Sequence, residues 1–170
     1  FAIDKQGVGY ITLEDGGELK LLKWNGVRGT HEYGVRTVKY PRYRPSYSGI
    51  AVTPDGRLVM TDPVNGCIGL YDHANLMELV PDPASMWGKD FDRRLLFKNP
   101  RDVAADDAGR LYVADTGNDR VAVLDNRGQF LLALDEQFDW FAPHAAAFAN
   151  GHLCVTERRG TRGRVYDVSA

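Results

Sequence analysis

The chain has 170 residues, of which 44% are hydrophobic and 26% charged, a composition that excludes a disordered protein. Its 21 Lys and Arg residues against 23 Asp and Glu residues give a net charge of −2, without the basic excess typical of dedicated nucleic-acid binders. No apolar run approaches the roughly 20 residues that a membrane-spanning helix requires. Cys67 and Cys154 form no C-x-x-C motif and have no zinc-ligand spacing.

Four segments of the chain repeat one pattern of short strands and turns. A glycine is followed six residues later by an acidic residue, eleven later by the start of another strand, and sixteen later by a second acidic residue. The pattern holds from Gly56, Gly109 and Gly151, and it persists without the acidic residues from Gly7. Repeats of about 40–50 residues with four short strands are typical of propeller blades. The sequence therefore predicts blade-like units at residues 1–40, 48–80, 99–134 and 143–170.

The third unit is the clearest of the four. It reads as the strands DVAAD, RLYVAD, RVAVLD and QFLLAL, which are separated by the turn sequences DDAG, TGND and NRG. Two longer insertions, residues 28–47 and 81–94, separate the first three units and are expected in loops on the faces of the propeller, where binding residues often lie. The sequence thus predicts an all-β protein with one repeated domain.

Residues 100–121 follow the pattern P-x-D-V-A-x-D-x-x-G-x-L-Y-V-A-D-x-x-N-x-R-V, which resembles the NHL repeat. This resemblance implies an NHL-type β-propeller, a fold that most often has six blades. About four blades are present here, so we expect the chain to be part of a longer six-bladed propeller, or to combine with other chains.

Charged pairs are predicted at the turn between the second and third strands of two units. Asp115 faces Arg120, and Glu157 faces Arg162, each in a position to form a charge-assisted hydrogen bond. We interpret both pairs as structural turn pairs. In the second unit Cys67 replaces the arginine, so Asp62 is expected to lack this partner.

The residue before the innermost strand differs between units and is polar in three of them: Ser48, Arg101 and His144. The resemblance places these positions around the mouth of the central channel. They are the basis of the leading hypothesis, a non-catalytic module that binds a protein partner or ligand and acts as an interaction scaffold. The predicted contact set is Ser48, Arg101, His144, Arg158, Tyr43 and Tyr47.

One alternative is a metal-dependent propeller enzyme. Residues 141–158 are similar to part of peptidyl-α-hydroxyglycine α-amidating lyase, which implies a metal held by histidines, with His144 in a matching P-H motif and Arg158 after the acidic residue. The second unit has Ser48 at the position of that histidine, and a catalytic zinc requires three protein ligands. The remaining histidines lie in other contexts: His31, His73 and His152. We therefore predict neither catalytic nor metal-binding residues in this chain.

Lactonases of the gluconolactonase type suggest a second form of this alternative. Asp62, Asn65, Asp115 and Asn118 carry the oxygen atoms that a hard divalent cation prefers. Their recurrence from unit to unit favours a role in the turns. A divalent metal, Zn or Ca, is accordingly expected only if the protein is an enzyme.

RNA binding is the third hypothesis. Residues 39–47 (KYPRYRPSY) and 158–164 (RRGTRGR) combine arginine with tyrosine, which can contact phosphates and stack on bases. The negative net charge makes RNA a less favoured partner than a protein or a larger assembly, and a small-molecule ligand stays possible. The sequence predicts a soluble protein without membrane insertion and does not indicate its compartment.

Overall fold

The structure, a computed structural model, consists of antiparallel β-sheets. It describes residues 1–15, 18–25, 36–38, 46–71, 86–87, 96–134, 142–158 and 163–169. Within these residues the longest helix is a single 3₁₀ turn, Thr116–Asn118. No helix in the described parts of the chain has the length and hydrophobicity to cross a membrane.

In the described residues, fifteen strands form four sheets, and within each sheet the strands lie in chain order. The first sheet contains β1 (Ala2–Ile3), β2 (Val8–Asp15), β3 (Glu18–Asn25) and β4 (Arg36–Val38). The second contains β5 (Ile50–Val52), β6 (Leu58–Asp62), β7 (Cys67–Tyr71) and β8 (Met86–Trp87). The third contains β9 (Pro100–Ala105), β10 (Leu111–Asp115), β11 (Arg120–Leu124) and β12 (Phe130–Leu134). The fourth contains β13 (Pro143–Ala149), β14 (His152–Glu157) and β15 (Gly163–Asp167).

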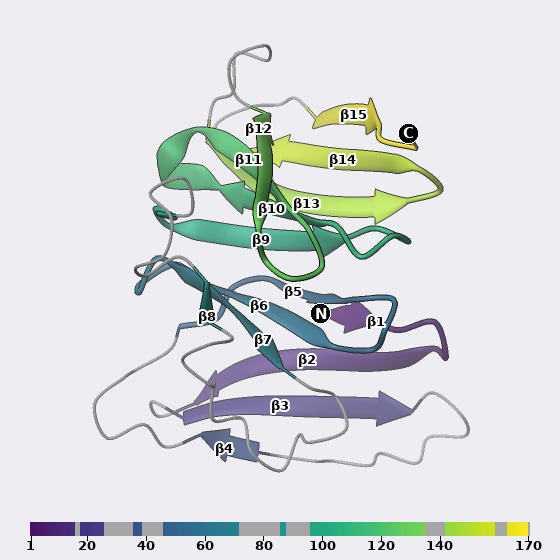
Figure 1. Cartoon of the computed structure of the whole chain (residues 1–170). Coiled ribbons are helices and arrows are strands. Elements are labelled where there is room, and N and C mark those ends of the chain that lie inside the picture. Colours follow the sequence, from purple (N-terminus) through teal and green to yellow (C-terminus); the bar gives the residue numbers. More distant parts are fainter. Residues whose placement is uncertain are drawn as a thin grey trace.

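The sheets stack face to face in chain order (Figure 1), and the first strands β1, β5, β9 and β13 contact one another in succession. This is the arrangement of consecutive propeller blades, in which the first strand of each blade is innermost. It confirms the predicted all-β fold of propeller type.

Hydrophobic clusters fill the space between successive sheets because strand residues alternate between the two faces. In β9, for example, Val103 packs toward the second sheet and Ala104 toward the fourth. The three clusters are Tyr10 with Ile50, Leu58 and Met60; Ala51, Val59 and Ile68 with Val103, Leu111, Val113, Ala122 and Leu124; and Ala104, Tyr112, Val121 and Val123 with Ala146, Leu153 and Val155.

The far face of the fourth sheet is not covered by any described residue. Along β14, Leu153 and Val155 are buried against the third sheet, whereas Cys154 between them is exposed. Val165 in β15 is 64% exposed. Within the described parts of the chain, this sheet is therefore packed on one side only.

The turns use a repeated aspartate. In Asp4, Asp106 and Asp125, Oδ1 accepts hydrogen bonds from the backbone N–H groups two and four residues later, at 2.8–2.9 Å. A glycine with φ near +80° follows three residues after each of them: Gly7, Gly109 and Gly128. This left-handed conformation is one that glycine adopts without steric cost, so the pattern specifies the turn locally.

Two arginines connect neighbouring sheets. Arg57 Nη2 donates to the carbonyl of Asn126 at 3.1 Å, and Arg110 Nη2 donates to the carbonyl of Val168 at 2.7 Å. Both arginines begin the segment that leads into the second strand of a sheet, and both reach the turn after the third strand of the next one.

Candidate functional site

The three polar residues predicted at the channel mouth occupy equivalent places, each being the extra residue of a β-bulge. In the third sheet Ala114 pairs with Asp102 and Asp115 with Pro100, which leaves Arg101 unpaired between them. In the fourth sheet Thr156 pairs with Ala145 and Glu157 with Pro143, which leaves His144.

Ser48 has the same place in the second sheet. Thr61 donates its N–H to the carbonyl of Gly49 at 3.0 Å and accepts the N–H of Ser48 at 3.1 Å, so one residue of β6 faces two residues before β5. Bulges redirect side chains and are common next to binding sites. We call Ser48, Arg101, His144 and Arg158 the rim set.

Hydrogen bonds between sheets bring the backbone of the rim set together. Ser48 Oγ donates to the carbonyl of Arg101 at 2.6 Å. The N–H of Ala146 donates to Asp102 Oδ2 at 3.0 Å, which joins β13 to β9. The N–H of Arg158 donates to the carbonyl of Ala142, directly before β13, at 2.9 Å. The rim set therefore lies at one end of the inner strands.

The side chains of the rim set are accessible to different degrees. Ser48, His144 and Arg158 are exposed, and Arg101 is partly buried. The Nε atom of Arg101 is fully buried and has no hydrogen-bond partner among the described residues. A buried donor without a partner costs free energy, so this atom requires an explanation.

The carboxylates at this end of the sheets are engaged inside the protein. Asp115 is fully buried and accepts hydrogen bonds from Lys98 N–H (2.7 Å), Asn118 Nδ2 (2.8 Å) and Arg120 Nε (2.8 Å). The predicted Asp115–Arg120 pair is therefore present in the structure. Asn118 also donates to the carbonyl of Leu96, which ties the turn to the segment before β9.

The other two carboxylates of this kind make contacts that the sequence did not indicate. Glu157 lies 3.3 Å from Arg164 Nε in β15, whereas the predicted partner Arg162 lies outside the described residues. Asp62 accepts hydrogen bonds from the backbone N–H and the Nδ2 group of Asn65, at 3.0 and 2.8 Å. Asn65 is thus a hydrogen-bond partner of Asp62, for which the sequence analysis had predicted no partner in this turn.

Asp102 is a partly buried acidic residue that the sequence analysis did not single out. Its Oδ1 accepts the N–H of Val103 at 2.9 Å, and its Oδ2 accepts the N–H of Ala146. Burial raises the pKa of Asp102, an effect that these N–H groups and His144 oppose. Its position directly after Arg101 was the only available signal in the sequence.

Of the two remaining members of the predicted contact set, Tyr47 and Tyr43, the structure describes only Tyr47. Tyr47 is half-buried and packs against the cluster of Ile50, Leu58 and Met60. Tyr43 lies outside the described residues, as do Arg159, His31 and His73. His152 is exposed at the opposite end of the sheets, and its Nδ1 atom lies 2.8 Å from the carbonyl of Asn150.

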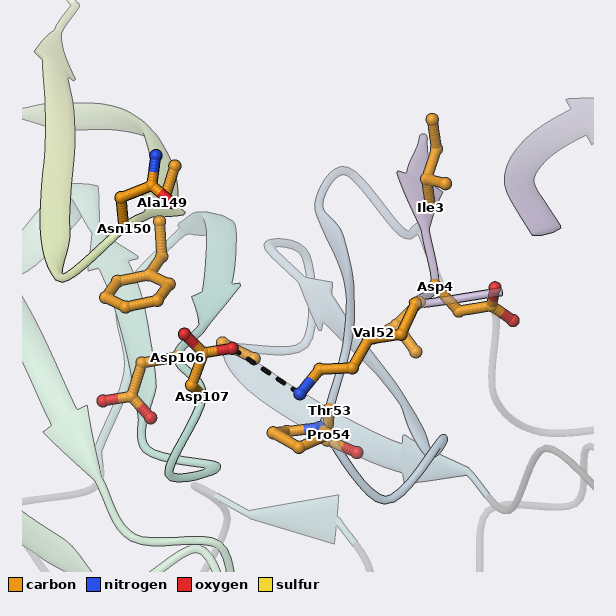
Figure 2. A pocket seen from close by; sticks show the side chains of 12 residues that line it. Ile3, Asp4, Val52, Thr53, Pro54, Asp106, Asp107, Ala149 and Asn150 are labelled. Atoms are coloured by element: carbon orange, nitrogen blue, oxygen red, sulfur yellow. Dashed lines mark ion pairs between the residues drawn. The ribbon is translucent and has the colours of Figure 1, made fainter. Parts of the chain in front are cut away.

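A pocket of about 250 Å³ lies at that opposite end, where the turns between first and second strands of all four sheets meet. Lys5 and Asp107 in its lining form an ion pair, with Nζ and Oδ1 3.6 Å apart. A dashed line that ends at Asp107 marks this pair in Figure 2. The carboxylates of Asp4 and Asp106, which line this pocket, accept the hydrogen bonds of their turns. They also accept the hydroxyl groups of Tyr10 and Tyr112, respectively. Burial raises the pKa of Tyr112 to about 12.

No group of three or more His, Cys, Asp or Glu side chains that could hold a metal ion occurs in the described parts of the chain. The carboxylates suggested as calcium ligands, Asp62 and Asp115, instead hold turns together. The metal-dependent alternative therefore gains no ligand set from these residues.

Comparison with known proteins gives a family match for one unit. Residues 97–124 match the model of the NHL repeat. Comparison of the chain with curated proteins gave no match. The matched residues include all of β9, β10 and β11 in the third sheet.

Several solved structures share the fold. Virginiamycin B lyase from Staphylococcus aureus superposes with a TM-score of 0.63 and 15% identity over 99% of this chain and 54% of that chain. A chain of a nidogen/laminin complex gives 0.65 and 18%, over 99% and 58%. Regucalcin, a calcium-binding protein from Agrobacterium tumefaciens, gives 0.61 and 14%, over 94% and 54%. At these identities the likeness shows a β-propeller fold alone, and the chain spans about half the length of these proteins.

Proposed function

The chain carries an NHL repeat within a β-propeller fold, and from this premise we propose that it is a non-catalytic binding module whose rim set contacts a protein partner. The observation that carries the proposal is the equivalence of Ser48, Arg101 and His144. Each is the extra residue of a bulge, so its side chain is freed from the regular alternation of the strand.

The architecture around the rim set supports a binding role. The inner strands on which these residues lie are held by buried clusters on both faces of the second and third sheets, so the rim is presented by a rigid scaffold. One structure with this fold is a chain in a nidogen/laminin complex. We extend that mode of action, binding of another protein, to this chain.

Affinity capture tests the proposal. The 170-residue chain and a variant with Arg101→Gln, His144→Gln and Arg158→Gln serve as baits, and Lys5→Gln with Asp107→Asn at the opposite end is the matched control. We expect one partner to be captured by the native chain and the control but not by the rim variant. A partner captured equally by all three would contradict the proposal.

The same samples separate the enzyme alternative from the binding module. Metal content is measured by mass spectrometry on the purified protein. Zinc or calcium retained at one ion per chain, and lost in a rim variant, would favour the metal-dependent enzyme and overturn a purely binding role.

A further inference from the structure

We propose that the rim set binds a carboxylate group, presented by an acidic segment of the protein partner. This inference rests on the proposed function, because it names the chemistry by which the rim would hold such a partner. It starts from Arg101, whose Nε atom is buried without a hydrogen-bond acceptor in the described structure.

Arg101 differs from the other arginine with a buried, unpartnered Nε. Arg57 uses its remaining nitrogens, since Nη2 lies 2.7 Å from Asp55 Oδ2 and donates to the carbonyl of Asn126. The guanidinium of Arg101 has no ion pair and no hydrogen bond within the described residues, although its backbone carbonyl is bound by Ser48. A guanidinium can bind a carboxylate through two parallel N–H groups. The Nε atom of Arg101 is covered by the protein, so the two Nη groups of the same guanidinium would donate to the ligand.

The charges at the rim are complementary to an anion. Arg158 and His144 are exposed, and neither forms an ion pair within the described part of the chain. Asp115 and Glu157 at the same end are buried against Arg120 and Arg164. The accessible groups of the rim set are therefore two guanidiniums and an imidazole. Of the carboxylates at this end, Asp115 and Glu157 have ion-pair partners, and the exposed Asp119 accepts the N–H of Ala142 at 2.9 Å.

Asp102 is the acidic group in the same strand, and it does not occupy this surface. Both of its oxygens accept backbone N–H groups, from Val103 and from Ala146 in the next sheet. Its Oδ1 atom also lies against Gly49, where an added Cβ would be only 2.5 Å away. The Asp102 carboxylate is thus enclosed between β5, β9 and β13, one position below the bulge that carries Arg101.

A carboxylate fits these observations better than an RNA phosphate backbone does. Binding of single-stranded nucleic acid uses exposed aromatic rings on which bases stack. Tyr47 packs against the core, and no member of the rim set is aromatic apart from the imidazole of His144. A short acidic peptide needs only the charged hydrogen bonds that the rim set can donate.

The test uses a fluorescein-labelled hexaglutamate peptide and the full 170-residue chain, with binding followed by fluorescence anisotropy. We expect saturable binding that weakens as salt is raised. Arg101→Gln should weaken it by at least about tenfold, because a hydrogen bond to a charged group is lost. Arg127→Gln, which removes an exposed arginine at the opposite end, should leave the affinity unchanged.

Two further probes make the result decisive. A hexalysine peptide should not bind, and an unstructured RNA oligonucleotide should bind more weakly than hexaglutamate at equal salt. Arg101→Lys, which keeps the positive charge but lacks the paired Nη groups, should recover only part of the affinity. Thermal unfolding of each variant shows whether the fold is retained, and a loss of binding counts only where it is.

The outcomes distinguish this inference from the proposed function. Tighter binding of RNA, or equal binding of hexaglutamate by the native chain and Arg101→Gln, would overturn the carboxylate site. If the affinity capture still yields a partner that depends on the rim set, the binding module stands and only the ligand chemistry is wrong. If neither experiment shows dependence on the rim set, both proposals fail.

Discussion

Asp102 shows how one side chain can join three strands of different sheets. Its carboxylate accepts N–H groups from its own neighbour Val103 and from Ala146, and it lies against Gly49. A carboxylate placed in this way is removed from water, so its charged form is less favourable than in the unfolded chain. The cost of charge is partly offset by the two N–H groups and by His144.

This environment predicts a pH dependence of stability. Burial raises the pKa of Asp102 above the usual 3.8, so the folded protein holds this proton more tightly than the unfolded chain does. The resulting stabilisation is complete at pH values below the unfolded pKa and is lost as pH rises through the raised value. The stability of the native protein relative to Asp102→Asn should therefore fall as pH rises from the usual 3.8 through the raised pKa. Urea denaturation of both proteins across this range measures the difference, and a rise with pH would contradict it.

At the scale of elements, an arginine directly before the second strand of a sheet forms a hydrogen bond to the next sheet in two successive units. Arg57 and Arg110 each donate to the carbonyl after the third strand of the next sheet. Arg110 also pairs with the buried carboxylate of Asp106. The fourth sheet has the exposed His152 at this position, so the contact does not continue there within the described residues.

Arg110→Met should loosen the fourth sheet from the third. The variant loses the hydrogen bond to Val168 and leaves Asp106 without its cation, at an expected cost of about 1–3 kcal/mol. Amide hydrogen exchange should become faster at Leu153 and Val155 in β14 than in the native protein, with a smaller change in β6. Arg57→Met is the matched variant and should instead loosen the second sheet from the third. Equal exchange changes in all sheets would contradict a local contact.

At the scale of the whole molecule, the stack of sheets depends on how closely the inner strands approach. A Cβ atom at Gly49 would lie 2.5 Å from the Cα atom of Asp102, so β5 and β9 meet where no side chain fits. Gly117 has a similar place, since its Cβ would lie 2.6 Å from the carbonyl oxygen of Lys98. Gly49 allows β5 to approach β9, and Gly117 allows the turn after β10 to approach the segment before β9.

Gly49→Ala should therefore destabilise the molecule as a whole. The added methyl group must displace the backbone of β9, and overpacking of this kind costs typically about 1–3 kcal/mol. Gly163→Ala in the fourth sheet is the control, because its Cβ would meet only the carbonyl oxygen of Val155, at 3.8 Å. Chemical denaturation compares the two variants with the native chain. An equal effect of both substitutions would show that the close approach of β5 and β9 is not what limits stability.

The sequence predicted the features that are encoded within one unit. The strand segment LYVAD coincides with β10, and the Asp115–Arg120 pair lies at the turn where the spacing indicated it. The contacts of Glu157 with Arg164 and of Asp102 with Ala146 were not predicted. They depend on how the side chains and sheets meet in space, and the spacing of residues along the chain does not report this.

The turn aspartates have a consequence for how such a chain can change over time. Each of Asp4, Asp106 and Asp125 shapes its turn through groups no more than four residues away. A duplicated unit therefore inherits working turns whatever its neighbours are. The contacts between units are not specified locally in this way. A newly added unit must fit against Gly49 or accept the hydrogen bond of Arg110 in the unit beside it. Propeller evolution by this route would copy units whole and then adapt the surfaces between them.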